Sequence, residues 1–329
     1  MTTEQPEMDG IPVLSANVLG VYGTRQPVYE LVEVPEEFGP VELAIDDEKL
    51  KQFAFIVDDY QEWHFTGSPF GRPIAHAGLL ANDVLQLFTL TYDPSRVVGL
   101  HTEEELWFEH PAFVGERVTL HGAYVEKYVR RGQGCVVMEA DVKGEDGRRI
   151  FRHRGVEIMR TVPGEIAGRR SAEPPARRVT GTFRPELGFV QKVTAGLLPG
   201  TALVPEQHHI TQAQMSLFSR AGEYVKNIHN DLEIARAGGL DRPIVQGQQL
   251  ACLLLGFLSR RFGWRWFETG WLKVKFLKPI SAGETVSLHG VVTDPQGGGA
   301  PRDEVELEVW IANQSGQMAV AGWARGRPS

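Results

Sequence analysis

The chain has 329 residues, a formal net charge of -8 and two cysteines. This length fits two ordinary domains or one large body, and the negative charge argues against general affinity for nucleic acid or anionic membranes. Cys135 and Cys252 stand alone in different halves, without the spacing of a disulfide scaffold or a metal site. Unpaired cysteines favour a reduced, intracellular setting.

The N-terminal segment has no recognisable secondary-structure pattern. Residues 1–40 show no sustained periodicity, no early cluster of Lys or Arg, and no apolar run long enough for a signal peptide or a membrane span. We therefore expect an N-terminal arm over residues 1–40, in a cytoplasmic protein that binds neither nucleic acid nor membrane.

A first structured unit is predicted over residues 41–162. Asp46 and Asp47 suit the first turn of a helix that continues to Val57, because apolar residues then recur at three- and four-residue spacing. A loop follows, and residues 74–90 form a pattern that is apolar all round, typical of a buried helix. Four strands are predicted near residues 97–109, 117–128, 134–143 and 148–159. One buried helix and an antiparallel meander make an α+β unit.

The same order of elements restarts after residues 163–185, an aperiodic stretch that we interpret as a linker. In the second unit, residues 186–329, Thr211 suits the N-cap of a helix through Ala221. A polar loop then leads into a short helix at residues 232–237. The predicted buried helix and strands lie near residues 245–261, 270–276, 284–292, 304–312 and 318–324.

The two units share residues as well as elements. Arg72-Pro73-Ile74 precedes the first buried helix, and Arg242-Pro243-Ile244 precedes the second. Phe108, Gly115 and Gly122 correspond to Phe276, Gly283 and Gly290, each pair 168 residues apart. We infer a duplication, and we predict that the two meanders pair edge to edge, which removes two exposed sheet edges.

The second unit resembles the MaoC-like, (R)-specific enoyl-CoA hydratase family. The matching residues are Glu223, Asn227-Ile228-His229-Asn230-Asp231, Ala235 and Pro243-Ile244-Val245-Gln246-Gly247. The resemblance covers most of residues 211–324 and, more loosely, residues 42–160. It implies a double hotdog fold, with two antiparallel sheets or one continuous sheet, each unit wrapped around its central helix.

The resemblance also implies a catalytic dyad, and it identifies His229 as the leading catalytic residue. In the family the acid lies five residues before the His, but here that position is Tyr224, and Glu223 lies six residues before. We expect Glu223 to be the acid; the alternatives are Tyr224 as a hydroxyl donor, or a copy without an acid. The residues expected to bind substrate are Tyr224, Asn227, Asp231, Gln246 and Gly247.

The first unit supplies a second candidate dyad. Asp59 precedes His64 by five residues, which is the family's spacing, but the loop after His64 is shorter. The pair is a relic, a loop pair in which Asp59 caps a turn, or the competent dyad.

Adding water across an α,β-unsaturated thioester requires a proton acceptor, a proton donor and stabilisation of a developing enolate. A carboxylate and a His facing one water molecule supply the first two. The free N–H groups at the start of the helix near Gln246-Gly247 supply the third, and Gly247 allows close approach of the substrate. No metal or redox cofactor is required.

The function that the resemblance implies is a hydro-lyase that hydrates 2-enoyl-CoA or dehydrates 3-hydroxyacyl-CoA, with coenzyme A or acyl carrier protein as the carrier. The alternatives are an acyl-CoA thioesterase and a non-catalytic acyl-binding hotdog subunit. A homodimer of double-hotdog units is a further hypothesis.

Overall fold

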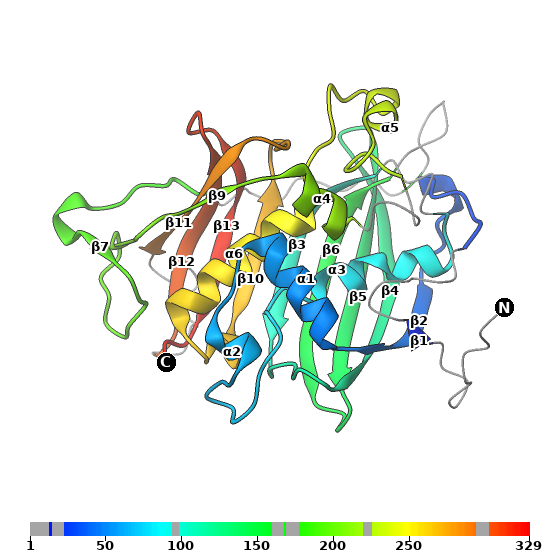
Figure 1. The fold of residues 1–329 in the computed structure, drawn as a ribbon. Helices are drawn as coiled ribbons and strands as arrows, with labels where there is room; N and C mark the ends of the chain where they lie inside the picture. The colour runs from blue at the N-terminus through cyan, green and yellow to red at the C-terminus, as the bar shows by residue number, and fades with distance from the viewer. Residues whose placement is uncertain are drawn as a thin grey trace.

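The computed structural model describes residues 13–14, 23–93, 99–159, 168, 178–219, 226–293 and 303–329. Their strands form one 13-stranded sheet that curves around central helical segments (Figure 1). The strands are β1 (Val13–Leu14), β2 (Glu36–Ala44), β3 (Leu100–Phe108), β4 (Arg117–Arg130), β5 (Gln133–Gly144), β6 (Arg149–Ile158), β7 (Phe189–Val190), β8 (Ala202–Leu203), β9 (Glu206–His209), β10 (Trp271–Phe276), β11 (Thr285–Thr293), β12 (Val305–Asn313) and β13 (Met318–Gly326).

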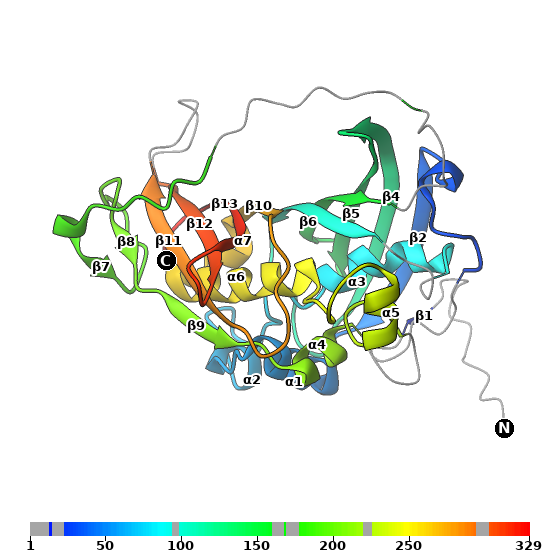
Figure 2. The ribbon, with the colours of Figure 1, turned by 90° about the horizontal axis from the view of Figure 1, so that it is seen from above.

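The helices lie in two layers on one side of this sheet. Figure 2 shows α6 and α3 directly against the sheet, with α1, α2 and α4 beyond them. The helices are α1 (Asp47–Val57), α2 (Glu62–Phe65), α3 (Ala81–Leu85), α4 (Gln212–Phe218), α5 (Leu232–Ala237), α6 (Gly247–Phe262) and α7 (Trp266–Thr269), with 3-10 segments η1 (Tyr29–Leu31), η2 (Gln86–Leu90) and η4 (Pro185–Leu187). None of the helices in the described part of the chain combines the length and apolar character needed to cross a bilayer.

The sheet contains two equivalent halves joined at their edges. Strands run in the order β2-β4-β5-β6-β3 in the first half and β10-β13-β12-β11 in the second, where β9 pairs with the outer side of β11. Antiparallel pairing of β3 with β10, which places Trp107 opposite Trp271, joins the halves. The predicted edge-to-edge pairing is confirmed, and of the two expected arrangements the chain has one continuous sheet.

Helix caps follow the local sequence. Asp46 Oδ1 accepts a hydrogen bond from Lys49 N at 2.7 Å and begins α1. Thr211 begins α4 through a capping box with Gln214. These N-caps confirm two predicted helix starts, because a side-chain oxygen at the N-cap satisfies a backbone N–H that has no partner within the helix.

The first buried helix is much shorter than predicted. Of residues 74–90, only Ala81–Leu85 is α-helical, and Gln86–Leu90 continues as a 3-10 segment. A Cβ on Gly78 would lie 2.8 Å from Cys252 Sγ of α6, so the chain before α3 is pressed closely against the other central helix. The uninterrupted apolar pattern reflected burial, which does not distinguish a helix from other buried backbone.

The outer strand of each half was also missed. Residues 1–40 were expected to form an irregular arm, but β2 starts at Glu36 and pairs with β4. A break in register between Phe38 and Val41 disturbs the alternation of apolar residues in β2, and β9 consists of four polar residues. Neither strand therefore has the period of two that sequence analysis relies on. The predicted loop after α1 contains the short helix α2.

A single cluster of buried apolar side chains runs through both halves, with Leu106 of β3 and Leu272 of β10 among its members. Most of the predicted linker lies outside the described residues.

Candidate active site

A cavity of about 500 Å³ lies between the two halves, at the N-terminal end of α6. The second half contributes Asn227, His229, Gln246 and Gly247 to its wall. The first half contributes η2 and the paired strands β3 and β6. Four of the predicted site residues are therefore brought together at one cavity, and the opposite wall comes from the other copy of the repeat.

His229 is held in one tautomer. Its Nδ1 lies 2.8 Å from the carbonyl oxygen of Ile244, and because a carbonyl can only accept, Nδ1 carries the proton. The other ring nitrogen, Nε2, is then the proton acceptor. Burial lowers the pKa of His229 to about 4. At neutral pH the ring is uncharged, as a general base requires.

The loop that carries His229 is braced by its own side chains. Asn227 Oδ1 accepts a hydrogen bond from His229 N at 2.9 Å, and Asn230 Oδ1 accepts one from Asn227 N at 2.9 Å. Asp231 accepts hydrogen bonds from the first turn of α5 and pairs with Lys226 at 3.1 Å. Asp231, predicted to bind substrate, is thus the N-cap of α5 and does not line the cavity.

The start of α6 provides backbone donors in the same cavity. Gln246 is the N-cap residue, and no side chain caps this first turn. Gln246 Nε2 donates to Asn82 Oδ1 at 3.2 Å, which ties the helix start to α3 of the first half. A Cβ on Gly247 would lie 3.3 Å from the ring of Phe276, so a glycine fits between the helix and that ring. The helix dipole favours negative charge at this end.

The predicted acid, Glu223, and its neighbour Tyr224 lie outside the described residues.

A family profile described as "MaoC like domain" matches residues 195–312. The chain contains a MaoC-like domain. This domain includes the loop with His229 and the whole of α6. No curated protein matches the chain in sequence.

Solved structures agree with the fold of the whole chain. A protein described as "MaoC-like dehydratase" has a TM-score of 0.68 and 16% identity, over 92% of this chain and 100% of the other. A Mycobacterium tuberculosis protein described as having a double hotdog fold has a TM-score of 0.62 and 14% identity, over 92% and 97% of the two chains. Full-length peroxisomal multifunctional enzyme type 2 from Drosophila melanogaster has a TM-score of 0.58 and 16% identity, over 90% of this chain and 48% of the other. The chain therefore has the double hotdog fold, in which the MaoC-like domain is the second unit.

The first unit repeats the His geometry of the MaoC-like domain. His64 Nδ1 lies 2.8 Å from the carbonyl oxygen of Ile74, just as His229 Nδ1 does from Ile244. The imidazole of His76 stacks on His64 with ring centroids 3.6 Å apart, and His76 Nε2 donates to the backbone oxygen of Asp59 at 2.8 Å. Burial lowers the pKa of both rings.

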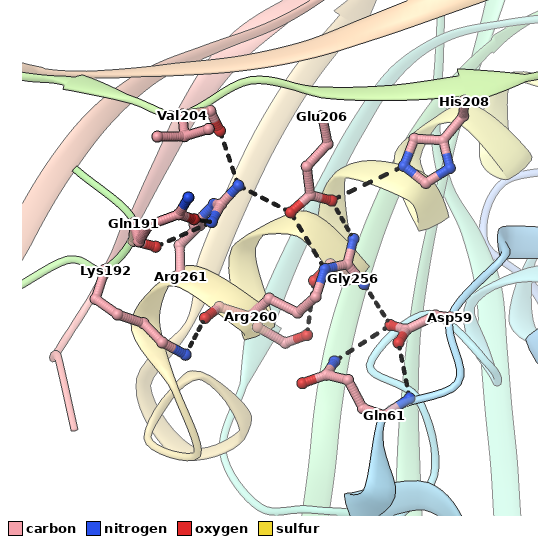
Figure 3. A network of polar contacts seen from close by, with 11 residues as sticks. Asp59, Gln61, Gln191, Lys192, Val204, Glu206, His208, Gly256, Arg260 and Arg261 are labelled. Carbon is pink, nitrogen blue, oxygen red and sulfur yellow. Dashed lines mark hydrogen bonds and ion pairs between the residues drawn. The ribbon is translucent and has the colours of Figure 1, made fainter. Parts of the chain in front are cut away.

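Asp59, the candidate acid of the first unit, forms an ion pair with an arginine. Figure 3 shows Arg260, near the C-terminal end of α6, between Asp59 and Glu206. Its Nη1 lies 2.8 Å from Asp59 Oδ2, and its Nη2 lies 2.5 Å from Glu206 Oε2. Arg261 also pairs with Glu206, at 2.9 Å. Burial raises the pKa of Glu206, but contacts with His208 and the two arginines outweigh burial and hold it at about 2.

The two candidate sites also differ in the room that they offer a substrate. The side chains of Asp59 and His64 are buried, and the cavity beside His76 measures only about 10 Å³. A thioester substrate cannot enter a space of that size. The cavity beside His229, with about 500 Å³, offers far more room for a substrate.

A charged cluster in the middle of the sheet was not predicted from the sequence. Glu104 is fully buried, and its Oε2 lies 2.9 Å from His153 Nε2 and 3.2 Å from His101 Nε2. Gln248 Nε2 of α6 donates to Glu104 Oε1 at 3.0 Å. A usable signal was present, since an acidic residue at an inward-facing position of a central strand needs a buried partner.

Two groups in the described residues could bring three donor atoms to a metal ion: Asp59, His64 and His76, and His101, Glu104 and His153. In the first group Arg260 already neutralises Asp59 and places a positive charge beside it, which disfavours a cation. In the second group both imidazoles direct Nε2 at one oxygen of Glu104, so hydrogen bonding and charge account for the arrangement.

Proposed function

We propose that this protein is a hydro-lyase that reversibly hydrates a 2-enoyl thioester to a 3-hydroxyacyl thioester in the cavity beside His229. The observation that carries the proposal is a neutral His229 of defined tautomer, facing a cavity at the uncapped N-terminal end of α6. A MaoC-like domain, and a structural neighbour described as a MaoC-like dehydratase, support it.

In the proposed reaction, Nε2 of His229 takes a proton from water while the water oxygen forms a bond to the β-carbon. The electrons of the double bond move toward the thioester carbonyl, whose oxygen gains negative charge. Backbone N–H groups at Gly247 and the dipole of α6 stabilise that charge. The α-carbon then takes up a proton, for which we propose Glu223 as the donor.

We propose that the first unit does not catalyse hydration but supplies the far wall of the cavity. Asp59 of its own dyad is paired with Arg260, and both side chains of the dyad are buried. We further propose a thioester of coenzyme A or acyl carrier protein as the substrate, a cytoplasmic location in keeping with two free cysteines, and a homodimer of double-hotdog units.

The test uses purified protein, crotonyl-CoA and the loss of enoyl absorbance. We expect His229→Ala to lower kcat/KM by a factor of about 10² to 10⁴, the usual contribution of a general base. His289→Ala is the matched control, because His289 lies on a strand, stacks on Trp310 at 4.9 Å and is not part of the cavity wall.

Three outcomes contradict parts of this proposal. Release of free thiol instead of loss of absorbance identifies a thioesterase. Full activity in His229→Ala, with loss of activity in Asp59→Ala or His64→Ala, assigns the reaction to the first unit. Binding without any turnover of thioesters identifies a non-catalytic subunit.

A further inference from the structure

The wall that the first unit contributes to the cavity is not purely apolar. His101 of β3 and Glu157 of β6 are directly opposite each other in the sheet, and both line the cavity. Around them the wall consists of apolar side chains such as Leu85, Phe88 and Ile158. Two ionisable groups therefore lie together at the end of the cavity formed by the first unit.

A local irregularity in β3 places His101 there. The pairing of β3 with β6 shifts register between His101 and Glu103, so Thr102 is an extra residue in the strand. This bulge allows His101 and Glu104 to approach within 3.2 Å although they are three residues apart. Bulges of this kind redirect side chains and are common beside active sites.

The ring of His101 is then held by a built cluster. His153 and Gln248 bind the two oxygens of Glu104, as described above. Gly155 leaves the necessary room, because a Cβ there would lie 3.0 Å from the ring of His153 and 3.3 Å from that of His101. A fully buried carboxylate with two imidazoles is costly to desolvate, and apolar residues in the same space would cost less free energy.

His101 lies close to the proposed position of the thioester. Its ring centroid is 4.9 Å from that of Phe276, and the ring of Phe276 also lies against Gly247 at the start of α6. One aromatic ring thus separates His101 from the helix end where the enolate oxygen is proposed to bind. Because His101 and Glu157 line the same cavity as His229, the acyl chain of a substrate bound there can extend to them.

We propose that Glu157, held beside His101, forms a polar subsite that hydrogen-bonds an oxygen on the acyl chain, so that the preferred substrate is a short enoyl thioester bearing a hydroxyl or carboxyl group. The inference rests on the proposed function. A hydrocarbon chain would remove water from Glu157 without replacing its hydrogen bonds, and sites built to bind an oxygen discriminate strongly against substrates that lack it.

The ionisation of the two groups supports this chemistry. Burial raises the pKa of Glu157, which favours its protonated, hydrogen-bond-donating form. Burial lowers the pKa of His101, but Glu104 outweighs burial and raises it above its ordinary value. The ring nitrogens of His101 are buried within the cluster, so Glu157 is the side chain that can donate to a substrate oxygen.

The experiment compares three coenzyme A thioesters of equal chain length: hex-2-enoyl, 6-hydroxyhex-2-enoyl and 5-carboxypent-2-enoyl. Hydration gives kcat/KM, and calorimetry with each thioester gives Kd. We expect at least one oxygenated thioester to exceed the hydrocarbon by about tenfold or more in both measurements. In Glu157→Leu the preference should fall by about tenfold or reverse.

Glu103→Gln is the matched control. Glu103 lies on β3, the strand of His101, but it pairs with Arg130 and Lys275 and does not line the cavity. It should keep the preference of the wild type. Equal or tighter binding and faster turnover of the hydrocarbon by the wild-type protein would overturn the subsite, whether or not Glu157→Leu folds. If no thioester is turned over but the oxygenated ones bind more tightly, the hydro-lyase proposal fails and the subsite stands.

Discussion

The two histidines of the repeated loop show how one backbone carbonyl sets the chemistry of a side chain. Ile244 and Ile74 each hold a ring by its Nδ1, so each ring presents Nε2 as an acceptor. What differs is the surroundings. His229 borders a cavity of about 500 Å³, whereas His64 is covered by His76 in a buried site.

The pKa of His229 leads to a prediction about pH dependence. If neutral His229 is the base, kcat/KM should stay constant on the acid side down to about pH 5 and fall as pH drops through about 4, where the ring gains a proton. A pH profile of kcat/KM for crotonyl-CoA measures this directly. A midpoint near 6.5, the value of a solvated His, would contradict a buried base.

At the scale of elements, α6 serves both units. Its N-terminal end borders the cavity next to His229, and its C-terminal end supplies Arg260 to Asp59. Gly256, one turn before Arg260, allows this contact, since a Cβ there would lie 3.1 Å from Asp59 Oδ2. One helix thereby leaves one site open and closes the other.

Removing Arg260 should destabilise the protein rather than release a second active site. Arg260→Ala leaves Asp59, only 3% exposed, without its ion-pair partner, and breaking such a buried pair costs about 3–5 kcal/mol of unfolding free energy. The double variant Asp59→Asn with Arg260→Ala should recover much of this loss, because residue 59 is then uncharged and Glu206 keeps its pair with Arg261. Urea denaturation of both single variants and the double variant gives the coupling energy.

Arg236→Ala on α5 is the control for that cycle, because Arg236 is exposed and its loss should change stability by less than about 0.5 kcal/mol. Additive effects of the two single changes would show that Asp59 and Arg260 do not interact in the folded protein.

At the scale of the whole molecule, the shared sheet couples the two halves. Glu105 of β3 accepts a hydrogen bond from Trp271 Nε1 at 2.9 Å and pairs with Lys273 Nζ at 2.7 Å, both on β10. The buried apolar cluster also continues across this junction. Separating the halves would expose two strand edges and part of the core at once.

We therefore expect the halves to unfold together. Leu272 is fully buried in β10, and Leu272→Ala should lower the unfolding free energy by about 2–5 kcal/mol. Because the halves are coupled, thermal unfolding followed by far-UV circular dichroism and by tryptophan fluorescence should shift by the same amount in both signals. Two separate transitions, of which only one moves, would mean that the halves are independent.

Much of this molecule follows from local patterns in the sequence. The caps at Asp46 and Thr211 and the eight main strands were predicted because each depends on residues close together in the chain, and the duplication was predicted because the same residues recur 168 positions later. The loop around His229 and the start of α6 were also predicted, and the structure brings His229, Asn227, Gln246 and Gly247 to one cavity. Which of the two similar candidate dyads borders an open cavity was not predictable in this way.

By itself, the sequence determined the eight main strands and two helix starts, the repetition of the unit, and which His-bearing loop resembles a catalytic one. Only the tertiary structure decided that Arg260, about 200 residues away in the chain, neutralises Asp59, and that Glu104 binds two imidazoles inside the sheet. The physical reason is that caps and periodicity act over a few residues. An open cavity and a buried ion pair depend instead on side chains that meet only when the two halves close around α6.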